Sequence, residues 1–387
     1  MQTKRRLGII FTFPIFESKG DFLAHIPIRM RRLLGNCVDI YVIYSGPLNR
    51  RILIDQGMYA IEMPRIKNKK IARLIFPVIL FFYAARLFRK DKLDVLMNAN
   101  NHKWMLLVAF AAHLFGKRAV ARVTGDILIY QYRGIGGKIQ VSFDKLIEKL
   151  ALRTVDEIFC VSQSLKTTIG KRVGQKQNIH VISQGVDTQR FKMPSREKVL
   201  DHFAKRLIFI GRIEPDKGLV YALNAFKQLR NKGYILSFDI YGDGSQGSFL
   251  EEQYSHIPGI KFHGHISHDK VPDTFASGGI LVLPSFHEGL ANTVLEAMAS
   301  GIFVIASDAG DNSLLLGKNE RGIVLSSVTA FEIRESIIRI LKNREDMIRS
   351  LFKAHDYIIK FHSFNHLRQK YLEILFGETC QPVAELY

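Results

Sequence analysis

The sequence has little cysteine, no hydrophobic run of membrane-spanning length and no acidic residue across one long basic stretch. The 3 cysteines among 387 residues, Cys37, Cys160 and Cys380, lie far apart and form no Cys-x-x-Cys pair. This usage argues against a disulfide framework and a zinc site of the usual spacing, and it fits a reducing cytoplasm. The basic N-terminus precedes a short apolar stretch that lacks a signal-peptide core and a small-residue cleavage site, so we expect residues 7–13 to form a first strand.

The stretch without acidic residues covers positions 63–90. Its centre, residues 74–85, is strongly apolar but too short to span a bilayer. Two interpretations remain open. The segment is either a core helix with a solvated basic end, or an interfacial helix that inserts aromatic side chains among anionic lipid headgroups. Its cations are Arg65, Lys67, Lys69, Lys70, Arg73, Arg86, Arg89 and Lys90.

Positive charge is concentrated in the first half of the chain. Residues 1–200 hold 35 Lys and Arg against 14 Asp and Glu, whereas residues 201–387 hold 20 against 22. The asymmetry predicts an anionic partner for the first half, such as a membrane surface, a nucleic acid or a phosphorylated substrate. No recognisable nucleic-acid module and no basic stripe with interleaved aromatics is present, so we expect no nucleic-acid partner.

Apolar β-rich runs alternate with helical patterns along the whole chain, which predicts parallel βαβ architecture. We expect two Rossmann-like, doubly wound α/β domains, at 1–195 and 196–360, followed by a C-terminal helix and tail at 361–387 that pack back on the first domain. The linker is placed in the polar stretch 187–205. The predicted strands are 7–13, 38–44, 95–97, 119–123, 157–161, 179–182, 207–210, 236–241, 260–263, 280–283, 302–306 and 322–325. The predicted helices are 21–34, 71–89, 103–115, 141–152, 219–232, 292–300, 331–342 and 345–375.

The most informative segment is 284–301, which follows the predicted strand 280–283. It places Glu288 on a loop and Glu296 on the first turn of the next helix, at the strand end where α/β proteins bind ligands. A second interpretation needs no ligand. Thr293 and Glu296 have the spacing of a capping box, with Thr at the N-cap and Glu three residues on. Capping does not account for Glu288 and Gly289.

A second charged loop, 209–218, follows the first strand of the second domain. Its Arg212 and Lys217 suit bidentate and point-charge contact with phosphate, and its glycines Gly211 and Gly218 allow close backbone approach. A solvated loop is the simpler explanation for each cation taken alone.

Together the two segments resemble the E-x7-E and Gly-Arg…Lys-Gly motifs of family 4 retaining glycosyltransferases, which have the GT-B fold of two Rossmann-like domains facing a cleft. The resemblance extends to 241–244, 260–267, 160–165 and 184–191, so it covers most of the chain. It implies that Arg212 and Lys217 hold the donor diphosphate, Glu288 contacts the donor sugar and Glu296 binds the ribose hydroxyls. The further implied donor contacts are Gly211, Gly264, Ile266, Gly289, Leu290, Ala291, Asn292 and Thr293.

On the acceptor side the resemblance implies roles for Gly20, His25, Gly125 and Asp126, with Asp126 orienting the acceptor. The sequence departs from the family pattern here, with one glycine in the first loop and Gly125-Asp126 where many members have a histidine. The donor side is therefore better specified than the acceptor.

The expected reaction is transfer of a sugar from a nucleotide-diphosphate sugar to an acceptor hydroxyl with retention, in cell-surface polysaccharide or glycolipid biosynthesis. Without an Asp-x-Asp motif, we expect neither an essential metal nor a cofactor beyond the nucleotide-sugar co-substrate. Metal binding by His263, His265 and His268 is conceivable. We expect a cytoplasmic protein, peripheral at the inner face of the membrane. The alternatives are a sugar-nucleotide epimerase or phosphorylase of the same fold, or a non-enzymatic basic membrane-binding or nucleic-acid-binding protein.

Overall fold

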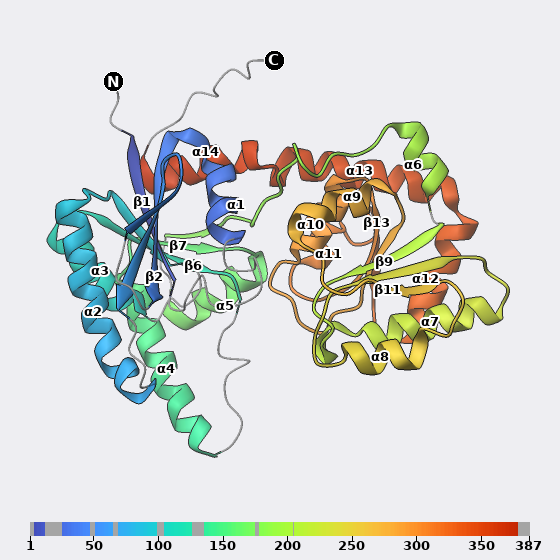
Figure 1. The fold of residues 1–387 in the computed structure, drawn as a ribbon, viewed down its shortest axis with the longest axis horizontal. Helices are drawn as coiled ribbons and strands as arrows, with labels where there is room; N and C mark the ends of the chain where they lie inside the picture. The colour runs from blue at the N-terminus through green and yellow to red at the C-terminus, as the bar shows by residue number, and fades with distance from the viewer. Residues whose placement is uncertain are drawn as a thin grey trace. The chain divides into compact units, whose positions relative to one another are not determined.

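The structure is a computed structural model that describes residues 4–11, 25–46, 51–64, 69–98, 104–125, 135–174, 178–203 and 205–377. Its contacts divide the chain into two compact units (Figure 1). Unit 1 comprises Met1–Ser183 and Leu367–Tyr387, and unit 2 comprises Gln184–His366.

Unit 1 is built on an eight-stranded sheet in the order β3-β4-β2-β1-β5-β6-β7-β8, in which only the edge strand β3 runs antiparallel to its neighbour. Its strands are β1 (Arg5–Ile10), β2 (Val38–Gly46), β3 (Arg51–Asp55), β4 (Met58–Pro64), β5 (Val95–Asn98), β6 (Arg118–Val123), β7 (Glu157–Cys160) and β8 (Ile179–Val181). Its helices are α1 (His25–Leu34), η1 (Gly35–Cys37), α2 (Lys69–Lys90), α3 (Met105–Leu114), α4 (Ile135–Thr154) and α5 (Gln163–Val173).

Unit 2 is built on a six-stranded, fully parallel sheet in the order β11-β10-β9-β12-β13-β14. Its strands are β9 (Arg206–Ile210), β10 (Ser237–Tyr241), β11 (Ile260–Phe262), β12 (Ile280–Leu283), β13 (Phe303–Ser307) and β14 (Ile323–Leu325). Its helices are α6 (Arg196–His202), η4 (Pro215–Lys217), α7 (Leu219–Asn231), α8 (Gly247–Tyr254), η5 (His268–Lys270), α9 (Val271–Ala276), α10 (Asn292–Ala299), α11 (Asn312–Leu315), α12 (Ala330–Lys342) and α13 (Arg344–His362), while α14 (Phe364–Phe376) continues into unit 1.

The prediction of two parallel-sheet α/β domains is confirmed. Central strands such as β12 and β13 are buried along their whole length, as expected for strands covered on both faces. The β3–β4 hairpin was not predicted from the sequence. Its turn contains Gly57 at φ +73°, whose added Cβ would lie 2.8 Å from Asp39 Oδ1. Gln56 and Gly57 therefore form a tight two-residue connection. Glycine tolerates the positive φ and avoids the clash of a Cβ with Asp39.

The chain passes between the units at residues 183–184 and 366–367, rather than at the predicted 195–196 and 360–361. Residues 184–195 are polar in composition, but Val186 and Phe191 are buried. The N–H of Val186 donates to the carbonyl of His362 at 2.8 Å, and the N–H of Phe364 donates to that of Val186 at 3.0 Å. This pairing holds Ser363 in an extended conformation, so the single helix predicted at 345–375 is interrupted there.

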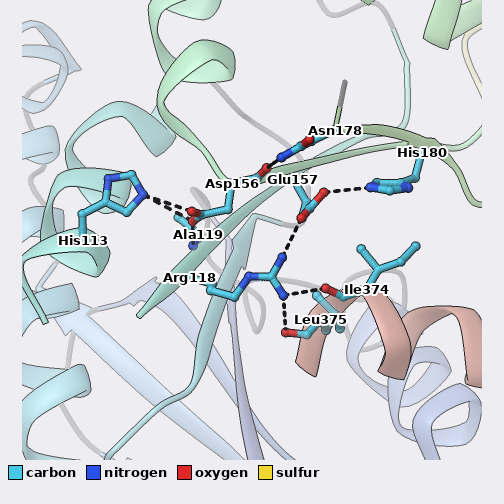
Figure 2. Close-up of polar contacts among 9 residues, drawn as sticks. All are labelled: His113, Arg118, Ala119, Asp156, Glu157, Asn178, His180, Ile374 and Leu375. Carbon is cyan, nitrogen blue, oxygen red and sulfur yellow. Dashed lines mark hydrogen bonds and ion pairs between the residues drawn. The ribbon is translucent and has the colours of Figure 1, made fainter. Parts of the chain in front are cut away.

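The last described turns of α14 contact the sheet of unit 1 through Arg118. Its guanidinium donates to the carbonyls of Ile374 at 2.7 Å and Leu375 at 3.0 Å and pairs with Glu157 at 2.6 Å (Figure 2). Because these are the last carbonyls of the helix, the cation also lies at the negative end of its dipole. The buried ring of Tyr371 packs edge-on against Phe159. Arg118 and Tyr371 thus attach a segment distant in sequence to β6 and β7.

Candidate active site

The strand order of unit 2 identifies where its ligand site should lie. The chain forms β9, β10 and β11 toward one edge of the sheet, and β12, β13 and β14 continue from β9 toward the other. The carboxyl ends of β9 and β12 therefore flank the point where the winding direction reverses, and doubly wound sheets bind ligands at this point. Both charged loops singled out in the sequence follow these two strands.

The two loops are in direct contact. The N–H of Phe286 donates to the carbonyl of Asp216 at 2.8 Å. Gly218 lies at φ +64°, and a Cβ placed there would come within 2.2 Å of the Pro284 carbonyl oxygen. No other residue fits this approach without moving the backbone. The glycine expected to permit a close approach thus packs the two loops together.

An ion pair joins the loops at the strand ends. Lys217 Nζ lies 2.7 Å from Glu288 Oε1, and each side chain is only 14% exposed. A Lys–Glu pair this well shielded has a stronger electrostatic interaction than one on the surface. The sequence predicted both residues as site groups, but it did not predict that they contact each other. Of the three hydrogens on the ammonium group, this bond uses one.

Arg212 differs from Lys217 in its surroundings. Its side chain is 63% exposed, and its guanidinium lies 3.9 Å from the carboxylate of Asp216. The structure therefore brings Lys217 to Glu288 and leaves Arg212 largely in solvent. The neighbouring Gly211 is closely packed, because a Cβ on Gly242 would lie 1.8 Å from its carbonyl oxygen.

The loop that follows β12 is supported by the loop that follows the neighbouring strand β13. Gly310, at φ +62°, approaches so closely that an added Cβ would lie 2.5 Å from the carbonyl oxygen of Gly289 and 2.7 Å from that of Glu288. Leu290 and Ala291 are buried. The backbone around Glu288 is therefore packed from two sides, by Gly218 near Pro284 and by Gly310.

The capping-box interpretation of Glu296 is wrong. Helix α10 begins at Asn292, its N-cap is Ala291, and no side chain caps it. Thr293 is thus already inside the helix, and Glu296 does not serve as the capping-box partner. The side-chain amide of Asn292 donates to Gln184 Oε1 at 3.2 Å. The positive end of the α10 dipole lies at Asn292, at the end of the loop that carries Glu288, and helix N-termini favour anions.

Glu296 is held by His268, which the sequence suggested only as a metal ligand. Its side chain is 6% exposed, and Oε1 lies 2.8 Å from Nε2 of His268. The other ring nitrogen, Nδ1, faces Arg190 Nη1 at 3.5 Å. Since a guanidinium can only donate, the arrangement favours the tautomer in which Nδ1 accepts and Nε2–H donates to Glu296. Arg190 also pairs with Asp269 at 2.7 Å, which orients the guanidinium.

The other histidines of the predicted cluster have different partners. His263 Nε2 lies 2.5 Å from Asp239 Oδ1, and its ring stacks on Tyr241 with centroids 4.3 Å apart. Burial opposes ionisation of Asp239, but hydrogen bonds from His263 and Arg206 outweigh it and lower the pKa of the carboxyl. His263 and His268 thus face separate carboxylates. Among the residues that the structure describes, no group of His, Cys, Asp and Glu side chains could hold a metal ion.

The segment 260–267, which contains the predicted donor contacts Gly264 and Ile266, lies beside the Asp239 carboxylate. Gly264 has φ +70° with open space where a Cβ would be, and its carbonyl accepts from the N–H of Gly242 at 2.8 Å. His265 and Ile266 line a cavity of about 390 Å³ together with Tyr241 and His263.

The acceptor-side residues are mostly not described. Gly20 and Asp126 lie outside the described residues. His25 is the first residue of α1, and only its backbone is described, while Gly125 follows β6.

Two family models match the chain, and together they take in most of it. The model described as Glycosyltransferase Family 4 matches residues 30–190, and the one described as Glycosyl transferases group 1 matches residues 204–343. The chain belongs to the family 4, group 1 glycosyltransferases. The first match lies almost wholly in unit 1, and the second lies in unit 2 with the site described above.

Individual relatives of this glycosyltransferase are distant in sequence. The chain is 24% identical to a 2-deoxystreptamine glucosyltransferase of Streptomyces kanamyceticus, over 68% of this chain and 72% of the relative. It is 25% identical to an Escherichia coli UDP-Gal:alpha-D-GlcNAc-diphosphoundecaprenol alpha-1,3-galactosyltransferase, over 71% and 72%. Anabaena HepE in complex with UDP has a similar structure, with a TM-score of 0.74 at 15% identity over 97% of this chain and all of the other. This structural likeness confirms the GT-B fold.

Proposed function

We propose that this glycosyltransferase moves a sugar from a nucleoside-diphosphate sugar to an acceptor hydroxyl with retention of configuration, in the synthesis of a cell-surface polysaccharide or glycolipid. The observation that carries the proposal is the shielded Lys217–Glu288 pair at the switch point of the unit 2 sheet. The pair joins the loop after β9 to the loop leading into α10. A nucleotide sugar bound here needs a cation beside its phosphates and a carboxylate beside its sugar hydroxyls, and the pair supplies both.

The leaving diphosphate gains negative charge as the bond to the sugar breaks. The two ammonium hydrogens of Lys217 that Glu288 does not use can donate to it, and the uncapped N-terminus of α10 adds a favourable dipole. Arg212, on an exposed side chain, can move to the outer phosphate oxygens. With these cations supplied by the protein, we propose that transfer needs no divalent metal.

The two carboxylates have separate roles in this proposal. Glu288 keeps one oxygen on Lys217 and uses the other to accept a hydroxyl hydrogen of the donor sugar. Glu296, held by His268 through Oε1, contacts the ribose hydroxyls. The acceptor oxygen bonds to the sugar on the face from which the diphosphate leaves, and the leaving phosphate takes the proton of the acceptor hydroxyl. Attack on this face retains the anomeric configuration. Asp126 and Gly125 remain our candidates for orienting the acceptor.

We propose a lipid-linked or polysaccharide acceptor met at the cytoplasmic face of the membrane. The cationic first half of the chain supports this placement, and so does the diphosphoundecaprenol substrate in the name of the E. coli relative. Among the described residues, no helix is long and apolar enough to cross a bilayer.

A thermal-shift screen against UDP-, GDP-, ADP- and dTDP-sugars tests the donor side, because a bound donor raises apparent stability by mass action. UDP-sugars come first in the screen, since the HepE structure holds UDP. Transfer from the best donor to lipid-linked acceptors, followed by NMR of the product, then determines the anomeric outcome. Inversion, or activity lost on EDTA treatment and restored by a divalent ion, would refute the corresponding part of the proposal. Conversion of the nucleotide sugar without any acceptor would instead indicate an epimerase.

A further inference from the structure

Three neighbouring helices of unit 1 leave large apolar side chains in solvent. Helices α2, α3 and α4 follow β4, β5 and β6, and α3 contacts both of the others (Figure 1). Each connects parallel strands that succeed one another in the same direction across the sheet. Right-handed crossovers therefore place all three on one face, running parallel to each other. Their exposed apolar residues are Ile75, Val78 and Phe82 in α2, Phe110 and Leu114 in α3 with Phe115 just beyond, and Leu146 and Leu150 in α4.

The exposure is a property of one helix face and not of loose packing. In α2, Phe76, Leu80 and Ala84 are buried against unit 1, while Phe82, on the opposite side, is 65% exposed. The exposed positions of α2 recur at spacings of three and four residues, so they form one stripe. Leu114 of α3 is 71% exposed. Large apolar side chains exposed on adjacent helices of a folded domain indicate an interaction site.

Among the described residues, the exposed charges on these three helices have one sign. The stripe of α2 continues into exposed Arg86 and Arg89, and α4 exposes Lys145 beside Leu146. Helices α2 and α3 contain no acidic residue. The two carboxylates of α4 point inward, since Asp144 and Glu148 are both buried. The outward faces of the three helices therefore combine apolar and cationic side chains. We call this surface the α2–α3–α4 face.

We propose that the α2–α3–α4 face docks on an anionic lipid bilayer, with the apolar residues entering the headgroup region and Arg86, Arg89 and Lys145 contacting lipid phosphates. A second copy of the chain fits poorly, because a two-fold interface would oppose the same cations with no carboxylate between them. A bilayer supplies both a hydrophobic layer and a negative surface. The inference rests on the proposed function only in that a membrane-associated acceptor would bring the enzyme to a bilayer. Bilayer binding itself requires no catalysis and can be measured separately.

The test is co-sedimentation of the full chain with vesicles of phosphatidylglycerol and phosphatidylcholine, compared with phosphatidylcholine alone. We expect binding to the anionic vesicles at least tenfold stronger. The variant Phe82→Ser/Leu114→Ser should lose about tenfold or more of this binding, because two large side chains no longer leave water. Arg86→Gln/Arg89→Gln should lose about fivefold for each charge and bind with a weaker salt dependence.

The matched controls are in unit 2. Phe249→Ser/Phe331→Ser removes two phenylalanines exposed by 63% and 65%, and Lys227→Gln/Lys353→Gln removes two exposed cations. Both should bind vesicles as the wild type does. Equal losses in the control and test pairs would overturn the proposal. So would concentration-dependent self-association without lipid that Phe82→Ser/Leu114→Ser abolishes, because that result assigns the face to a second copy. Nucleotide-sugar binding by the same variants reports separately on the proposed function.

Discussion

The two units of this glycosyltransferase differ in how their chemistry is encoded. In unit 2 the site consists of charged side chains and glycines at strand ends, held by short contacts such as Lys217–Glu288 and Gly218 against Pro284. In unit 1 the distinctive feature is a surface of apolar and cationic residues on three helices. A nucleoside diphosphate presents the same groups whatever the sugar, so its site can be specified by a few residues at defined positions. The bilayer contact that we propose for unit 1 needs an extended surface instead.

The largest expected effect comes from Glu288. The variant Glu288→Gln keeps the size of the side chain but removes the charge next to Lys217, so turnover should fall roughly a hundred- to a thousandfold. Initial rates of sugar transfer measure this. Glu320→Gln, at a side chain 73% exposed in unit 2, is the matched control and should be neutral. Normal turnover of Glu288→Gln would remove this residue from the site.

The next effect tests His268 as the positioning residue of Glu296. In His268→Ala the carboxylate loses its donor, so KM for the donor should rise about tenfold while kcat changes little. His268→Gln can still donate to Glu296 and should recover most of the affinity. His256→Ala, an exposed histidine in the same unit, is the control. A fall in kcat with an unchanged KM would show that His268 does not act through donor binding.

Arg212 should matter less than Lys217, because its side chain is mostly in solvent before the donor binds. We expect Arg212→Ala to weaken donor binding by about three- to tenfold, as for one exposed charge-assisted contact. Arg349→Ala, with a side chain 68% exposed on α13, is the comparison and should have no effect. If Arg212→Ala weakens donor binding as much as Lys217→Ala does, the Arg212 side chain must leave its solvent-exposed position when the donor binds.

The smallest effect concerns stability. The lowered pKa of Asp239 means that its ionised form stabilises the fold above the ordinary carboxyl pKa, and that this contribution is lost as the pH falls through the lowered value. Asp239→Asn should therefore lower the free energy of unfolding by about 2 kcal/mol at neutral pH. The difference from wild type should shrink in acid, as measured by urea denaturation. If the difference in the free energy of unfolding between wild type and Asp239→Asn does not depend on pH, the lost stability comes from altered packing and not from the lost charge.

Much of the fold could be predicted from the sequence because strand and helix periods alternate regularly in both halves. The β3–β4 hairpin was missed, since its signal is only the Gln56-Gly57 turn. The break at Ser363 was also missed, because it depends on Val186, which is far away in the sequence. Both cases need tertiary contacts that local patterns do not contain.

The site was predictable only where motifs name residue types. Lys217, Glu288 and Glu296 were predicted from motifs that resemble those of the family, but a motif does not indicate which side chains touch. His268 was noticed only as a conceivable metal ligand, and its bond to Glu296 joins residues 28 positions apart. The capping-box interpretation failed because Thr293 and Glu296 fit two structures equally well, and only the start of α10 at Asn292 distinguishes them.

The central claim is that Lys217, paired with Glu288, binds the diphosphate of the donor. The direct measurement is the equilibrium affinity of wild type and Lys217→Ala for the preferred nucleoside diphosphate and for the corresponding nucleoside. Lys217→Ala/Glu288→Gln removes the repulsion that an unpaired Glu288 would add, and Lys227→Ala is the control. We predict that both Lys217 variants lose about tenfold or more of their affinity for the diphosphate and keep their affinity for the nucleoside. Unchanged diphosphate binding by Lys217→Ala would contradict the claim.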